Sequence, residues 1–215
     1  RHNIVNFLKW LVLAVLTGLI VGGASGIFAK CIGAATAYRD AHIRIFLLLP
    51  FAGLLIVFLY WKLGSQDGGT NQVLATIKSK DKIPFISAPL IFLSTLLTHL
   101  TGGSAGREGA ALQIGGSLGN LLGKIVHLDD EDRHVLIMCG MSAAFAALFG
   151  TPMAAAVFSM EMVSVGVMYY SALVPCVMSA LIGAHLASTF GVHAEKFTIV
   201  SIPSFSIDGA AKTVL

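Results

Sequence analysis

A single glutamate, Glu108, is the residue of this chain whose type and neighbours best suit chemistry. It lies beside Arg107 within the glycine-flanked sequence 106–109 and follows a long apolar run. Glycine lets a ligand approach the backbone closely, and a helix beginning here would present unpaired N–H groups and the positive end of its dipole. Such a helix start is an anion site. An ionised Glu108 could occupy this site and a protonated Glu108 could leave it, so one side chain could couple a proton to an anion.

The same two residues have a structural alternative. Arg107 and Glu108 could form an ordinary pair in a loop at a membrane surface. Ionisable residues at membrane depth are rare and functional by default, and the surrounding glycines set this pair apart from a generic loop. The functional interpretation therefore depends on whether the neighbouring elements lie in a membrane.

The composition indicates that they do. Hydrophobic residues make up 56% of the 215 residues and charged residues only 12%, and the mean hydropathy is +0.83. A soluble domain is usually about a quarter charged, so this chain has too little polar material to cover a water-soluble globule. These values argue against a cytoplasmic enzyme, a disordered chain and a nucleic-acid binder. They favour a protein whose main surroundings are the lipid bilayer.

The apolar segments are of unequal length. They cover residues 10–29, 45–61, 83–106, 110–122, 135–160 and 162–194. The first is long enough to span a bilayer and too long for the apolar core of a signal peptide, whereas 110–122 is too short to cross. A mixture of full and broken helices is typical of transporters. We therefore expect an all-α, polytopic membrane domain with full, tilted and broken helices over residues 1–194, and an extramembrane tail or linker over residues 195–215.

Local signals predict how these helices pack and begin. Gly115, Gly119 and Gly123 recur every fourth residue and would place one face of a helix against a neighbour. The acidic residues 129–132 can cap the helix that follows. The sequence Gly-Thr-Pro at 150–152 interrupts the fifth segment, with the proline as the first residue of a new helix.

The distribution of Lys and Arg favours a multi-pass protein of the cell membrane with a cytoplasmic N-terminus. The residues on the N-terminal side of the first two spans are Arg1, Lys9, Lys62, Lys78, Lys80 and Lys82. The loop between these spans carries only Arg39 and Arg44, with Asp40 between them. Because cytoplasmic loops carry the excess of positive charge, the first side is expected to be the cytoplasm.

The residues around Glu108 also resemble a known family. Gly-Arg-Glu-Gly at 106–109, followed by Ala110, resembles the GREGP signature of the CLC family of chloride channels and proton-coupled anion transporters. The resemblance continues through residues 113–116 and 132–161 and covers the region 64–190. It implies half of a two-fold inverted repeat, within a homodimer in which each subunit has its own pore.

The resemblance also implies roles for individual residues. Glu108 would be the external gating glutamate, and the amides around Gly106, Arg107 and Gly109 would face the anion. Where the family reads GSGIP, with a serine that contacts chloride, this chain reads GTNQV at 69–73. Thr70 and Asn71 would then supply a hydroxyl and an amide N–H to the anion.

A second departure from the family's pattern concerns a residue that accepts the transported proton. Many proton-coupled members carry two consecutive glutamates after the proline-rich break, and here the pair reads Glu161-Met162. Met162 cannot carry a proton, and Glu161 is either a helix-end residue with a structural hydrogen bond or support for a proton path near the inner side. Both departures resemble the fluoride-exporting, proton-coupled branch of the family. Fluoride is therefore favoured over chloride, with protons as the coupled ion.

The resemblance covers only the first half of the family's fold. The second-half motif GIFAP and a pore-lining tyrosine have no counterpart here, and Tyr169 and Tyr170 lie in the first half. The chain is thus expected to be a fragment or to require a complementary C-terminal half. Two alternatives to proton-coupled antiport stay open: a passive anion channel, which Met162 motivates, and a membrane assembly half-domain that transports nothing.

No metal site and no cofactor are expected. The histidines show no metal-ligand pairing, and the glycine-rich sequence 102–106 is not a phosphate loop. His99, inside an apolar run, could shuttle protons, although a hydrogen-bonded structural histidine is the favoured interpretation. Cys31, Cys139 and Cys176 match no metal motif and are expected to be small buried residues.

Overall fold

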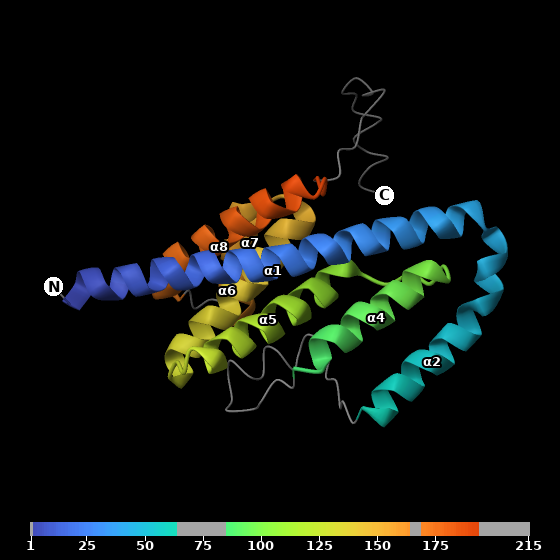
Figure 1. Cartoon of the computed structure of the whole chain (residues 1–215), viewed down its shortest axis with the longest axis horizontal. Helices are drawn as coiled ribbons and strands as arrows, with labels where there is room; N and C mark the ends of the chain where they lie inside the picture. Colours follow the sequence, from blue (N-terminus) through green and yellow to red (C-terminus); the bar gives the residue numbers. More distant parts are fainter. Residues whose placement is uncertain (1, 64–84, 164–168, 194–215) are drawn as a thin grey trace, which may run out of the picture.

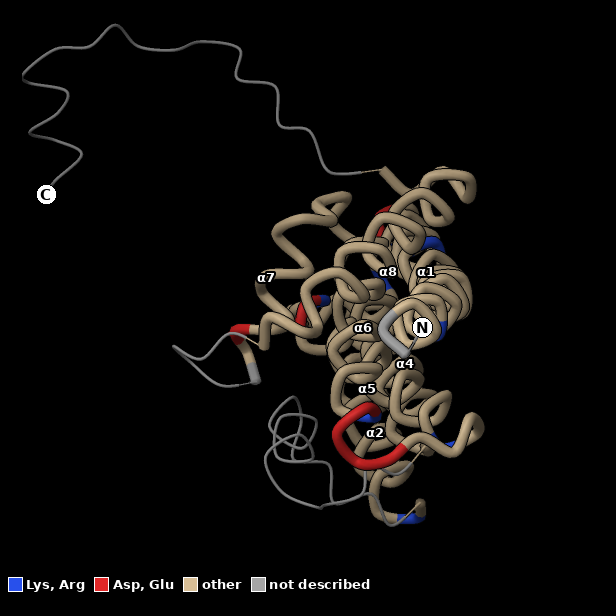
Figure 2. The backbone as a smooth tube through the Cα atoms, turned by 90° about the vertical axis from the view of Figure 1, so that its left-hand side faces the viewer, with Lys and Arg blue, Asp and Glu red and all other residues tan. Residues whose placement is uncertain are grey.

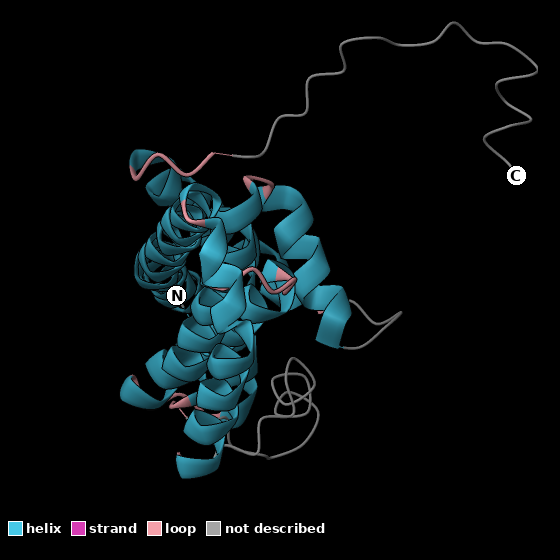
Figure 3. Ribbon diagram, turned by 90° about the vertical axis from the view of Figure 1, so that its right-hand side faces the viewer, coloured by secondary structure: helices cyan, strands magenta, loops and turns pink. Residues whose placement is uncertain are grey.

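The described part of the chain is built from helices. This computed structural model describes residues 2–63, 85–163 and 169–193, and no strand occurs within these ranges (Figure 3). In chain order, the helices are α1 (His2–Ala41), η1 (Ile43–Leu48), α2 (Leu49–Lys62), α4 (Ser87–Leu100), α5 (Arg107–Ile125), α6 (Asp130–Phe149), α7 (Pro152–Val163) and α8 (Tyr170–Thr189) (Figure 1). The expected all-α fold is confirmed.

Full-length and shorter apolar helices coexist, as expected. The segments long and apolar enough to cross a membrane are Ile4–Ala41, Ile43–Lys62, Asp130–Phe149 and Tyr170–Thr189 within the described residues. Helix α4 is shorter, with 14 residues. Along α2, Phe51, Val57 and Trp61 are 68%, 67% and 78% exposed, and such a row of bare apolar side chains suits contact with lipid.

Three predicted segments have different bounds in the structure. The run 83–106 is helical only over Ser87–Leu100, because the chain turns at Gly102, whose φ of +85° favours glycine. The apolar segment 110–122 lies within a longer helix, since α5 has 19 residues, but α5 is not among the described helices that are long and apolar enough to cross a membrane. Helix α1 continues through Lys30, because lysine is a good helix former and does not end a helix.

Glycines bring α5 and α6 into backbone contact. A Cβ added to Gly115 would lie 2.4 Å from the carbonyl oxygen of Gly140, and one added to Gly119 would lie 2.5 Å from that of Leu136. A Cβ added to Gly123 would lie 2.8 Å from the Arg133 side chain. The predicted glycine face is therefore confirmed, and the order of these contacts makes α5 antiparallel to α6.

A second set of glycines packs α8 between α1 and α6. A Cβ on Gly22 would lie 2.4 Å from the Cα of Gly183, and one on Gly183 would lie 2.8 Å from the Ala143 carbonyl oxygen. Further along, Gly26 of α1 faces Phe190, just after the end of α8. Helices α1, α6 and α8 therefore run in the same direction, and the core forms where they meet.

The predicted helix ends are also confirmed. Asp129 is the N-cap of α6, and its carboxylate accepts a hydrogen bond from the Asp132 N–H at 2.8 Å. Helix α6 ends at Gly150, whose φ is +67°, and Pro152 is the first residue of α7. The break at 150–152 thus separates two helices instead of kinking one.

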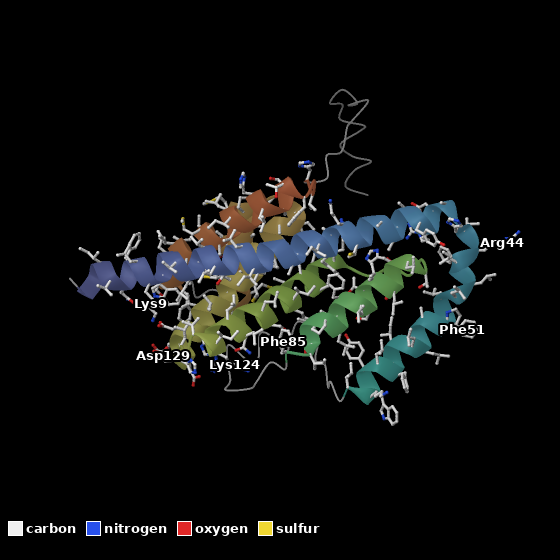
Figure 4. The ribbon with its side chains drawn as sticks, in the orientation of Figure 1. Lys9, Arg44, Phe51, Phe85, Lys124 and Asp129 are labelled. Carbon is white, nitrogen blue, oxygen red and sulfur yellow. The ribbon has the colours of Figure 1, made fainter. Side chains whose placement is uncertain are left out.

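These directions give the molecule two distinct ends. At one end, Lys9 of α1 forms an ion pair with Asp132 of α6, and Figure 4 places Lys9, Lys124 and Asp129 there and Arg44 at the other end. Most of the described backbone carries no charged residue (Figure 2). We call the first end the Lys9 end. Helix α5 begins away from this end, partway along the length of α1, and runs toward it (Figure 1). We call the region around its start the Glu108 end.

Candidate functional site

The start of α5 has the properties of an anion site. Gly106 is its N-cap, with extended backbone (φ −71°, ψ 142°), and makes no side-chain capping hydrogen bond. The N–H groups of the first turn therefore have no capping side chain from this residue. A helix of this length also contributes a positive dipole end at the same place.

Glu108 folds back over this helix start. A Cβ added to Gly106 would lie 2.7 Å from the Oε2 atom of Glu108, so the carboxylate fills the space that a side chain at position 106 would need. Both residues are exposed in the described structure, and Arg107 and Gly109 are half-buried. The carboxylate thus lies beside the first-turn backbone, where an external anion would also be attracted.

A tight turn between α4 and α5 precedes this site. The Gly103 N–H donates to the Thr98 carbonyl at 2.8 Å, and a Cβ on Gly102 would lie 2.5 Å from the Phe46 ring of η1. The turn is therefore restrained by a hydrogen bond to α4 and by the packing of η1 against it. A Cβ on Gly103 would lie 2.6 Å from the Thr98 side chain, so a side chain at either glycine would require its neighbours to shift.

His99 connects this turn to two arginines. Its ring hydrogen-bonds to the backbone of Ala105, the residue before the N-cap, and the charges of Arg39 and Arg107 both act on it. The ends of α1, α4 and α5 therefore meet around the turn. The two arginines place positive charge near the helix start, and the buried Nε2 atom of His99 has no hydrogen-bond partner among the described residues.

The predicted site residues fall into three groups. Gly106, Arg107, Glu108 and Gly109 come together at the start of α5. Thr70 and Asn71 lie outside the described residues. Glu161 lies on a different helix, α7.

Glu161 is half-buried in the last turn of α7 and is not brought to Glu108. Its neighbour Met160 packs in a core cluster with Val135 and Met138, in the first half of α6. Near the start of α5, Ala110 and Ala111 pack with Leu148, near the end of α6, whereas Leu112 belongs to the same cluster as Met160. Glu108 thus lies in the first turn of α5 and Glu161 in the last turn of α7.

Sequence reasoning missed one group of polar residues on α5. Gln113, Ser117 and Asn120 are buried, with 5%, 2% and 3% of their surfaces exposed. Their spacing of four and then three residues was the available signal, since it puts all three on one face of a helix. Amides and a hydroxyl at these positions are unusual in so apolar a sequence.

Metal ligands do not cluster in the part of the chain that the structure describes, where no three His, Cys, Asp or Glu side chains come together. Cys139 and Cys176 are fully buried, as expected, and their sulfurs are 3.9 Å apart. Cys31 is only half-buried, which corrects the expectation for that residue.

The fold and the helix start together define a helical membrane protein with an anion-compatible site. A model of the voltage gated chloride channel family matches residues 52–215. The chain therefore belongs to the CLC family of voltage gated chloride channels.

Similar proteins agree with this membership. The chain is 40% identical over 193 residues to a chloride/fluoride channel protein of Pseudomonas syringae pv. tomato, covering 89% of this chain and 43% of that protein. It is 29% identical over 167 residues to an H(+)/Cl(−) exchange transporter of Cronobacter sakazakii, covering 70% of this chain and 36% of that protein. The chain thus spans less than half the length of these relatives.

Two solved structures share the fold. A CLC-type fluoride/proton antiporter superposes with a TM-score of 0.85 at 32% identity, covering 96% of this chain and 53% of the other. A slow cyanobacterial Cl−/H+ antiporter superposes with a TM-score of 0.71 at 21% identity, again over 96% of this chain and 52% of the other. The expected half of a CLC-type fold is confirmed.

Proposed function

We propose that this chain is one half of a transporter that exchanges a small halide, with fluoride favoured and chloride possible, for protons. One observation carries the proposal: the Glu108 carboxylate lies over Gly106 at a helix start that the N-cap side chain does not cap. An ionised carboxylate there competes with an anion for the same N–H groups. Protonation removes that competition, so release of the site and uptake of a proton are one event.

The other site residues are assigned to the same task. The amides around Gly106, Arg107 and Gly109 hold the anion, together with Thr70 and Asn71. Arg39 and Arg107, whose charges act on His99 beside the turn, raise the local concentration of anions. Glu161, in the last turn of α7, supports the proton path at the inner side.

The choice of fluoride rests on the relatives and on the sequence. The relative at 40% identity is named for both chloride and fluoride, and the structure at 32% identity is that of a fluoride/proton antiporter. The absence of the usual serine at Thr70 and of a second glutamate at Met162 points to the same ion. A small anion such as fluoride also forms the stronger hydrogen bonds to N–H groups, because its charge is more concentrated.

A second candidate function is a passive anion channel of the same family. Met162, next to Glu161, motivates it, because a thioether cannot relay a proton. The two functions differ in one measurable respect. An imposed anion gradient drives protons uphill only in the antiporter.

We also propose an assembly, in which the need for a second half is supported by the greater length of the relatives. A complementary C-terminal half completes the site, the finished subunits form a homodimer, and residues 1–194 form the membrane domain, with 195–215 as a tail or linker. The protein lies in the cell membrane with a cytoplasmic N-terminus, which makes the Glu108 end external. Its partners are halide, protons and lipid, and it catalyses no chemical conversion.

The substitution Glu108→Gln tests the gating assignment. Glutamine keeps the size of the side chain but stays neutral, so proton movement driven by a fluoride gradient should fall to background in liposomes that contain the chain and its complementary half. Passive anion flux should persist. Glu131→Gln, on an exposed glutamate in the first turn of α6, is the matched control and should leave coupling intact; unchanged proton movement in Glu108→Gln would refute the assignment.

A further inference from the structure

A groove opens between α1 and α8 at the Lys9 end. Its volume is about 330 Å³, and its lining is mostly apolar. Ligand pockets have this character and begin at about 300 Å³, so the groove is large enough to hold part of a small molecule. The side chains that form most of its walls are Phe7, Trp10 and Leu11 of α1 and Val174, Pro175 and Met178 of α8.

The packing of the two helices explains why the groove forms. A Cβ on Gly18 would lie 2.8 Å from the Cβ of Ile182, so α1 and α8 approach each other closely there. Leu11 and Phe7 precede Gly18 by seven and eleven residues and therefore lie on the same face of α1. Their larger side chains hold the helices apart, and the groove is the space between them.

The groove lies where the protein meets lipid. Val5, Leu8 and Val12, around the groove on α1, are exposed apolar residues, and such a surface suits the bilayer. Trp10 lines the groove and Tyr169 is exposed nearby, and these residue types gather at the boundary between hydrocarbon and water. The acyl chain of a lipid is therefore the molecule that is most available to fill the groove.

Opposite charges lie side by side at the mouth of the groove. The Lys9 ammonium lies 5.7 Å from the centre of the Trp10 ring and forms an ion pair with Asp132 of α6. The Lys9 and Asp132 side chains are 40% and 27% exposed, so a headgroup can reach both. A headgroup that carries a phosphate and an ammonium group complements this pair, because the phosphate would meet Lys9 and the ammonium group would meet Asp132.

The groups around Asp132 favour one kind of ammonium. Ser171 lines both the groove and an adjoining cavity of about 210 Å³, whose walls include Asp132 and Tyr169. Pro175 lies inside α8 and has no N–H, so the Ser171 carbonyl lacks its usual helical donor. Carboxylate and carbonyl oxygens accept hydrogen bonds, and a primary ammonium has three N–H groups to donate. The trimethylated ammonium of choline has none.

We propose that the groove binds one ethanolamine phospholipid. An acyl chain lies between Trp10 and Val174, the phosphate pairs with Lys9, and the ammonium group donates to Asp132 and Ser171. The site is separate from the start of α5, and the inference does not depend on the proposed transport function. The bound lipid joins the first turns of α1 and α8, as the glycine contacts join these helices further along.

Tryptophan fluorescence tests whether the lipid occupies the groove. The chain has two tryptophans, so Trp61→Phe leaves Trp10 as the only reporter. The probe is a small, fixed fraction of lipid with brominated acyl chains in vesicles of choline phospholipid. Brominated ethanolamine lipid should quench Trp10 about threefold more than brominated choline lipid, a ratio that one surface ion pair can supply.

Two comparisons control this measurement. Trp10→Phe leaves Trp61, which is exposed on α2, and the ethanolamine and choline lipids should quench it equally. Brominated lipid with a glycerol headgroup, which has no ammonium group, should quench Trp10 no more than choline lipid does. Equal quenching of Trp10 by the ethanolamine and choline lipids would overturn the proposal, and so would stronger quenching by the glycerol lipid.

Substitutions test the two parts of the site in the Trp61→Phe protein. Asp132→Asn removes the charge that meets the ammonium group, and Val174→Phe narrows the groove, so each should abolish the preference for ethanolamine lipid. Val12→Phe is the matched control, because Val12 is as exposed as Val174 but lies outside the groove, and it should keep the preference. An unchanged preference in both Asp132→Asn and Val174→Phe would show that the lipid binds elsewhere and would overturn the proposal. The comparison of lipids in the Trp61→Phe protein decides the question even if either variant does not fold.

Discussion

Because Gly106 has no side chain, the carboxylate of Glu108 can lie against the start of α5. Glu108 reaches back over Gly106, and any Cβ there would come within 2.7 Å of its carboxylate oxygen. The contact is with the end of a flexible side chain, so the glutamate can move away at little cost in folding free energy. Gly106 therefore controls the position of the carboxylate rather than the stability of α5.

We expect Gly106→Ala to displace Glu108 from the helix start. External anion should then bind without competition, so the dependence of anion flux on external pH should flatten, while the melting temperature changes by only a few degrees. Flux in liposomes across a series of external pH values measures this. Gly53→Ala, at a position with nothing within 4 Å of an added Cβ, should behave as the wild type, and a similar pH profile in both variants would contradict the role of Gly106.

At the scale of the elements, backbone contact between glycines holds the helices that carry the site. A Cβ on Gly140 would come within 2.2 Å of the Gly115 carbonyl oxygen. Backbone cannot give way as a side chain can, so α5 would have to move off α6. The position of the α5 start, and of Glu108 with it, thus depends on the contact between α5 and α6 at Gly115 and Gly140.

We expect Gly140→Ala to destabilise the protein by about 1–3 kcal/mol, as overpacking of a core does. Thermal unfolding in detergent would measure the loss. Gly33→Ala on α1 is the matched control, because nothing lies within 4 Å of the added methyl and alanine favours a helix. Equal melting temperatures for the two variants would show that the crossing tolerates a side chain.

The sequence predicted where these helices begin better than it predicted how long they are. Asp129 and Pro152 carry the chemistry of helix starts, and both begin helices as expected. The bounds of α4 and α5 were wrong, because hydropathy does not register the positive φ of Gly102 or the polar residues that extend α5. The burial of Gln113 and Ser117 depends on contacts between distant segments, which no local pattern reveals.

At the scale of the whole molecule, the chain leaves the proposed site open to its surroundings. Glu108 is exposed at the start of α5, and the chain corresponds to 53% of the fluoride/proton antiporter structure that it resembles. A helix start that is open on one side holds an anion weakly, because water competes for its N–H groups. Transport is therefore a property that we assign to the completed assembly.

We expect the chain alone to insert into liposomes without moving fluoride, and a complementary half to restore the flux. A fluoride electrode and a pH electrode would follow both ions. Fluoride flux from the chain alone, at the rate of the completed assembly, would contradict the need for a second half. Glu108→Gln in the assembled protein separates coupled flux from leak.

The length of α1 has a consequence of its own. Its 40 residues correspond to about 60 Å, twice the roughly 30 Å hydrocarbon thickness of a bilayer. An upright α1 would therefore project far into the water, and a strongly inclined one would lie largely within the lipid. Helix α8 packs along α1 through Gly22 and Gly183, so a change in the inclination of one must carry the other with it. Membrane thickness, and with it the lipid composition of the cell, thus becomes a variable that acts on the arrangement of the whole bundle.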